Sequence, residues 1–175
     1  MRRSIPRPPV QPIGADVFEP LEDCHRVTLR MLAELATLVA RVEQLGVDPR
    51  AREMAGSVER YFSQDLPRHH IDEETHVFPT LTRCGDAETI QAVARLKQDH
   101  AWLRADWRVL SPLVKALAAG QSWVDVDALR DGVEVFCALA RDHIALEESL
   151  VYPQARILML ESTRREMRLA LASRL

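Results

Sequence analysis

Two copies of one short motif carry residue types that bind transition metals. His69 is followed four positions later by Glu73, and His143 is followed at the same spacing by Glu147. In each copy a second Glu comes next, and an aliphatic residue, an aromatic residue and a proline close the motif. A His and a Glu four positions apart project from the same face of a helix. The repeat therefore predicts two helices that offer imidazole and carboxylate ligands to one metal centre.

Long helices must position these side chains, because apolar residues recur at helical spacing and almost no segment alternates like a strand. We expect helices from about 16 or 17 to 45, from 49 to 81, from the N-cap Asp86 to about 119, and from 126 to 151. Pro67 and Pro112 predict kinks within the second and third helices, and the proline at 153 predicts an end or a bend. A shorter helix could follow over 162–175. Four long helices with short connections predict an all-α, up-down-up-down four-helix bundle with this short fifth helix at the C-terminus.

In such a bundle, candidate ligands early on the first and third helices lie beside those late on the second and fourth. The candidates are His25, His69, Glu73, His100, His143 and Glu147. Six protein ligands exceed the four of a tetrahedral zinc site. Two metal ions bridged by the two glutamates would use all six and leave a position for a small exogenous ligand. Iron suits this set well, and manganese or zinc are less distinctive alternatives.

Composition limits the other functions. A net charge of −3 gives no basic footprint for nucleic acid, and no run of about 18 apolar residues predicts a membrane helix. The basic N-terminus lacks an apolar segment, so we expect no secretory signal. Three widely spaced cysteines, Cys24, Cys84 and Cys137, predict no disulfide framework and favour the cytoplasm. We expect an extended Pro/Arg-rich arm over 1–15, the bundle over 16–160 and the last helix over 161–175. A homodimer is left open.

The doubled His-x-x-x-Glu-Glu-x-x-(aliphatic)-(Phe/Tyr)-Pro motif resembles that of the hemerythrin-like, or HHE cation-binding, family. The resemblance extends over about 17–153, nearly the whole chain. It implies a non-haem di-iron centre with an oxo or hydroxo bridge inside a four-helix bundle. It also implies that the four histidines are terminal ligands and that Glu73 and Glu147 bridge the metals.

One position departs from the oxygen-carrying members of that family. They place a His-x-x-x-His pair on the third helix, whereas Arg104 follows His100 at this spacing. The departure weakens the case for simple oxygen carriage and favours sensor-like, iron-handling or redox members. We expect a protein that binds or senses O2, NO or iron. A di-iron enzyme that reduces peroxide or NO, or repairs iron clusters, is one alternative, and a metal-free structural bundle is another.

No Ser, Cys or Lys nucleophile constellation is evident, so no catalytic residue is assigned and enzymatic activity stays open. Two further histidines adjoin the first motif. His70 points about 100° away from His69, which predicts a surface position or a supporting role beside the ligands. His76 shares the face of His69, seven residues on, and is either an extra ligand or a neighbour of the site.

Overall fold

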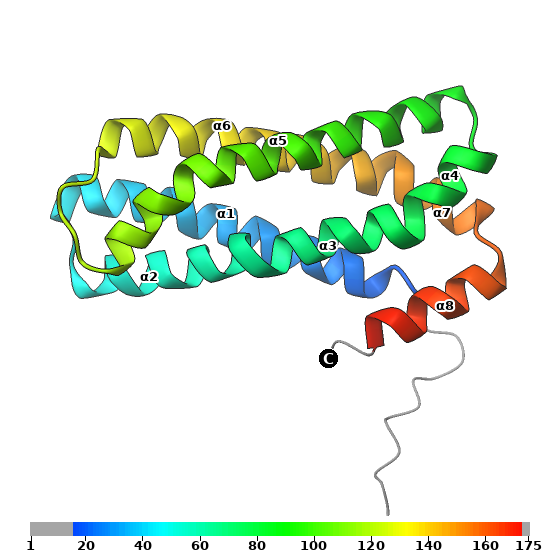
Figure 1. Ribbon diagram of the computed structural model, residues 1–175, viewed down its shortest axis with the longest axis horizontal. Helices are drawn as coiled ribbons and strands as arrows, with labels where there is room; N and C mark the ends of the chain where they lie inside the picture. The colour runs from blue at the N-terminus through cyan, green and yellow to red at the C-terminus, as the bar shows by residue number, and fades with distance from the viewer. Residues whose placement is uncertain (1–15, 173–175) are drawn as a thin grey trace, which may run out of the picture.

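A computed structural model describes residues 16–172 of the chain. Four helical rods lie side by side along the long axis, and a short fifth helix packs against one end (Figure 1). Each rod contacts its neighbours in the order expected of an up-down-up-down bundle: α1 with α2, α2 with α5, α5 with α6, and α6 with α1. No strand occurs among the described residues. The predicted all-α bundle with a fifth helix is confirmed, while the arm over 1–15 lies outside the described residues.

Two of the rods are composite, because short π-helical turns interrupt them. The α-helices are α1 (Glu19–Leu45), α2 (Pro49–Arg60), α3 (Leu66–Asp72), α4 (Phe78–Cys84), α5 (Ala87–Ala118), α6 (Val126–Leu146), α7 (Tyr152–Leu158) and α8 (Glu161–Ala172). The π-turns are η1 (Tyr61–Asp65), η2 (Glu73–Val77) and η3 (Glu147–Val151). The second rod thus runs from α2 to α4, and the fourth from α6 to α7. The fourth rod continues beyond the predicted end at 151.

Every π-turn ends immediately before a residue that precedes proline. The N–H of Leu66, Phe78 or Tyr152 closes each turn by donating to the carbonyl five residues earlier. In a regular α-helix the proline ring would clash with the carbonyl four residues before it. A wider turn just ahead of the proline relieves that clash without ending the helix. Bulges of this kind are frequent at functional sites, and two of these begin at the motif glutamates.

Aspartates begin three of the helices. The Asp48 carboxylate accepts a hydrogen bond from the N–H of Ala51, and Asp86 accepts one from Thr89, which confirms Asp86 as an N-cap. Asp125 caps α6 in the same way. Each cap satisfies a backbone donor that has no partner within its helix. The turn before Asp48 uses Gly46 at a φ of 71°, a conformation that costs glycine little.

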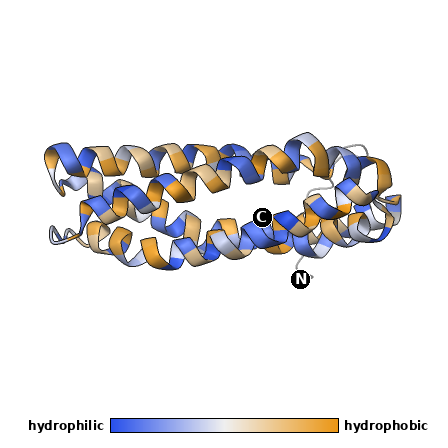
Figure 2. Cartoon of the chain, turned by 90° about the horizontal axis from the view of Figure 1, so that it is seen from above, coloured by the Kyte–Doolittle hydropathy of each residue, from blue (hydrophilic) through white to orange (hydrophobic). Residues whose placement is uncertain are grey.

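The bundle has two apolar clusters with a polar layer between them. One cluster fills the half that contains α2, with Leu35, Val58 and Phe136 among its fully buried members. The other fills the half that contains α4, α7 and α8, and Met167 of α8 packs into it. Figure 2 shows apolar and polar residues distributed around each helix, as expected when only one face is buried. The motif residues lie between the clusters, so protein closes their layer at both ends.

None of the helices in residues 16–172 combines the length and the apolar character needed to cross a bilayer.

Candidate metal centre

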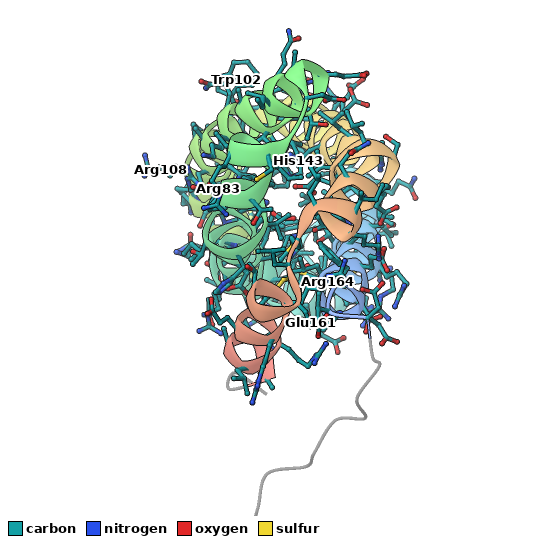
Figure 3. All side chains as sticks on the ribbon, turned by 90° about the vertical axis from the view of Figure 1, so that its right-hand side faces the viewer. Arg83, Trp102, Arg108, His143, Glu161 and Arg164 are labelled. Carbon is teal, nitrogen blue, oxygen red and sulfur yellow. The ribbon has the colours of Figure 1, made fainter. Side chains whose placement is uncertain are left out.

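All six predicted residues meet in the buried layer of the bundle. His25 comes from α1, His69 from α3, His100 from α5 and His143 from α6. Glu73 and Glu147 are the first residues of η2 and η3, and both side chains are completely buried. Viewed along the bundle, the His143 side chain lies between the helices, whereas Trp102 and Arg108 point outward (Figure 3).

Glu73 faces histidines on both sides of the layer. Its Oε1 atom lies 3.3 Å from Nε2 of His69 and 3.9 Å from Nε2 of His25. Its Oε2 atom lies 3.4 Å from Nε2 of His100. The two carboxylate oxygens therefore face different histidines, Oε1 toward His69 and His25 and Oε2 toward His100.

Glu147 repeats this arrangement from the opposite rod. Its Oε2 atom lies 3.2 Å from Nε2 of His25, and its Oε1 atom lies 3.2 Å from Nε2 of His143 and 4.0 Å from Nε2 of His100. Two groups of potential metal ligands result, and both contain Glu73 and Glu147. We call them the α1/α3 position, with His25 and His69, and the α5/α6 position, with His100 and His143.

The second glutamate of each motif orients a histidine on a neighbouring rod. Glu148 Oε1 lies 3.0 Å from Nδ1 of His25, and Glu74 Oε1 lies 2.7 Å from Nδ1 of His100. Carboxylates that hold the far nitrogen of an imidazole are typical of metal sites, because they fix the ring and direct its other nitrogen inward. Glu74 and Glu148 thus each pair with a histidine of a neighbouring rod and fix the orientation of its ring.

The aromatic residues of the two motifs also reach the layer. Phe78 stacks on His100 with ring centroids 5.7 Å apart, and Tyr152 stacks on His25 at 5.3 Å. The Tyr152 hydroxyl donates a hydrogen bond to Oε1 of Glu73, an interaction that Phe78 cannot make. Residues five apart lie about 140° round an α-helix, but the wider π-turn returns the aromatic ring to the face of its glutamate. Tyr152 is a functional candidate that the sequence reasoning missed, because it reads as an apolar match to Phe78.

For His70 the sequence predicts a surface position or a supporting role beside the ligands. The side chain is only 1% exposed, so the surface position is wrong, and a buried position beside the ligands remains. Its ring stacks on His100 with centroids 3.9 Å apart, and it forms a third potential ligand group with His100 and His143. His76 is half-buried and belongs to none of the ligand groups found among residues 16–172.

The charges in this layer compensate one another. Burial alone would lower the pKa of His143, but the nearby Glu147 and Asp99 raise it to about 10. Burial opposes the charge of Glu147, yet His143 and His25 hold its pKa well below the usual value. Burial lowers the pKa of His69 and His70, so both imidazoles are neutral near pH 7 and have a lone pair available.

Several buried polar atoms in this layer have no hydrogen-bond partner. They include both ring nitrogens of His70, which have no ion-pair contact among residues 16–172 either. Nε2 of His100 and of His143, Oε2 of Glu73 and both carboxylate oxygens of Glu147 also lack a hydrogen bond, but they lie at the ion-pair distances given above. Unpartnered buried polar groups cost about 1–3 kcal/mol each. Cations placed among these atoms would satisfy them and offset the carboxylates, with release of protons from the histidines. The donor set therefore fits metal ions.

Comparison with known families agrees with this chemistry. The chain matches the model of the hemerythrin HHE cation-binding domain over residues 16–155. That match covers most of the chain, so the protein belongs to this family of metal-binding helical domains. A search of curated proteins found no match to the chain.

Proposed function

We propose that this protein holds a non-haem di-iron centre that binds or senses a small ligand such as O2 or NO. The observation that carries the proposal is the sharing of Glu73 and Glu147 between two ligand groups, each with its own pair of histidines. Two metal ions a few ångströms apart need such shared carboxylates. Imidazole with carboxylate suits iron, although the same set accepts manganese or zinc.

Within the centre, the residues of the chain have separate roles. His25, His69, His100 and His143 would be terminal ligands, and Glu73 and Glu147 would be shared between the two ions. Bound iron would supply a redox-active ion with a coordination position for an exogenous ligand. Glu74 and Glu148 orient two of the imidazoles. Tyr152 holds Glu73, and burial together with the nearby carboxylates keeps its pKa well above 10, so the phenol remains a donor.

Two cavities support a small ligand. A cavity of about 10 Å³ adjoins His25, His69 and His143, which is about the space that one water molecule needs. An outer pocket of about 420 Å³ opens between the second rod and α5. Leu66, His70 and Leu103 line both cavities, so these side chains form the wall between them. The inner cavity has room for a group of about the size of one water molecule, whereas a larger substrate would remain outside this wall.

Arg104 supports sensing over simple oxygen carriage. Its guanidinium lies 3.8 Å from Oε1 of Glu74, the carboxylate that orients His100. Arg104 therefore acts on the outer carboxylate and supplies no imidazole to the α5/α6 position. The Arg104 side chain is 43% exposed, so the contacts from His100 through Glu74 to Arg104 connect the metal site to the protein surface. A partner at this surface could detect a change at the metal ions.

An enzyme is the second candidate, and one observation favours it. Tyr152 places a buried phenolic proton beside Glu73, where it could be delivered to a reacting peroxide or NO. A metal-free structural bundle is the third candidate, and the unpartnered polar atoms of the buried layer weigh against it. An iron-handling role, including cluster repair, would use the same ligands.

The test combines spectroscopy with a count of turnovers. The purified protein is loaded anaerobically with ferrous iron and exposed in turn to O2, NO and hydrogen peroxide. Sensing predicts a spectral change that saturates at one ligand per centre and reverses when the ligand is removed. Many equivalents of peroxide or NO consumed, with the activity abolished by His69→Ala, would establish the enzyme instead. An unchanged spectrum with all three ligands would refute both.

A further inference from the structure

We propose that His70 is a seventh metal ligand, which completes the α5/α6 position with a third imidazole. The inference rests on the proposed metal centre but goes beyond its six residues. Ring nitrogens of His70, His100 and His143 lie within 4.8 Å of one another. The rings of His70 and His100 are stacked with their planes 10° apart, so one of them must turn before the in-plane lone pairs of both can meet one ion. Arg104 supplies no imidazole to this position, and the third one would come from the second rod instead.

The surroundings of His70 support a ligand over a packing residue. The side chain is 1% exposed, yet neither ring nitrogen has a hydrogen-bond partner among the described residues. A residue needed only for packing would avoid this cost, because an apolar ring of the same shape fills such a site without it. The second copy of the motif has an apolar residue at this place, because Ile144 occupies the position equivalent to His70 and is also buried.

The position of the second rod explains how adjacent histidines serve different metals. This rod packs against α1 on one side and α5 on the other. Nε2 of His69 lies 3.0 Å from Nε2 of His25 on α1, whereas the ring of His70 stacks on that of His100 on α5. A rotation of about 100° per residue separates these two directions. Two consecutive residues can therefore contribute to the two metal positions.

The two positions then differ in their ligands. The α5/α6 position has three imidazoles, from His70, His100 and His143. The α1/α3 position has two imidazoles, and the Tyr152 hydroxyl lies 3.3 Å from Nε2 of His25. The inner cavity adjoins histidines of both positions, so the number of imidazoles at each position decides between them. The exogenous ligand is therefore expected at the α1/α3 position, where fewer imidazoles occupy the coordination sphere and a phenol stands nearby.

His70→Phe is the test variant, because it removes both nitrogens and keeps a ring that can stack on His100. His76→Phe is the matched control, since it makes the same change on the same rod outside the ligand groups. Both are compared with the unsubstituted protein by anaerobic titration with ferrous iron and with cobalt(II). Losing a carboxylate that supports a ligand typically weakens metal binding about 10–100-fold. We expect His70→Phe to weaken one of the two ions more than about 100-fold and the control to keep both.

A second measurement reports the ligand directly. In the cobalt(II) protein, each bound imidazole gives a paramagnetically shifted N–H proton resonance, and His70→Phe should remove one that His76→Phe retains. The metal-free His70→Phe protein should be at least as stable as the unsubstituted protein, which would show that the variant folds. Two ions bound by His70→Phe within about threefold of normal affinity, or the same shifted resonances in both variants, would overturn the role of His70 alone. An unsubstituted protein that binds neither metal would instead overturn the proposed function.

Discussion

Replacing Tyr152 with Phe isolates one hydrogen bond at the heart of the buried layer. The hydroxyl donates to Oε1 of Glu73, and the other oxygen of this carboxylate has no hydrogen-bond partner. A hydrogen bond to a charged acceptor contributes about 1.5–3 kcal/mol to stability. Phe78, the equivalent residue of the other motif, shows that a phenyl ring can pack at such a position. The substitution should therefore remove the bond without creating a large cavity.

In protein freed of metal with a chelator, Tyr152→Phe should lower the free energy of unfolding by about 1.5–3 kcal/mol. For a chain of this size, each kcal/mol changes Tm by about 2–4 °C, so a fall of about 3–12 °C is expected. Chemical denaturation and calorimetry would measure both quantities.

Tyr61→Phe provides the control, because the Tyr61 hydroxyl bonds a neutral partner, Thr28, at 2.7 Å. A neutral hydrogen bond contributes only about 0.5–1.5 kcal/mol. The reasoning requires the larger loss at Tyr152. Equal losses in the two variants, or a loss below about 0.5 kcal/mol for Tyr152→Phe, would refute a charge-assisted bond to Glu73.

Three further measurements test the packing, the charges and the metal. Phe136→Ala should cost about 3–5 kcal/mol in denaturant unfolding, because a fully buried ring packed on Phe62 is lost, and a cost below about 1 kcal/mol would contradict this packing. Arg41 and the N–H of Ala51 lower the pKa of Asp48 from 3.8 to about 2. The ionised carboxylate therefore stabilises the folded protein above pH 3.8, and this stabilisation is lost as the pH falls through about 2. Asp48→Asn should lower the free energy of unfolding at pH 7 and match the unsubstituted protein below pH 2. Ferrous iron at about 100 times its Kd should stabilise the protein by about 2.7 kcal/mol per site in calorimetry, and no shift of Tm with iron would count against a metal centre.

The fold was predictable because its signals are local and repeated. The sequence predicted helix starts at 49 and after the N-cap Asp86, and the caps formed by Asp48 and Asp86 confirm both starts. The meeting of His25 with His69, and of His100 with His143, followed from antiparallel helices of similar length. Depth along each helix was sufficient to bring these residues together, and no knowledge of side-chain conformation was needed.

Features that depend on rotation around the second rod were not predictable in this way. A helical wheel with one buried face places His70 outside, whereas this rod packs against two neighbours and buries a wider arc. The π-turns were not predicted, because one extra residue in a turn changes the spacing of apolar residues too little to be recognised in the sequence. The residues before Pro67, Pro79 and Pro153 were the available signal, since each closes a π-turn. Pro112 shows why that signal alone is insufficient, because α5 remains α-helical through it.

The most direct test of the metal centre is metal content, measured with the ultraviolet-visible spectrum, for the purified protein beside the Glu73→Ala/Glu147→Ala double variant. The two carboxylates are shared by both ligand groups, so their joint loss should abolish both positions. The account predicts about two irons per chain, with near-ultraviolet absorption that disappears in the double variant. Absence of metal from the unsubstituted protein, or equal metal in both proteins, would contradict it.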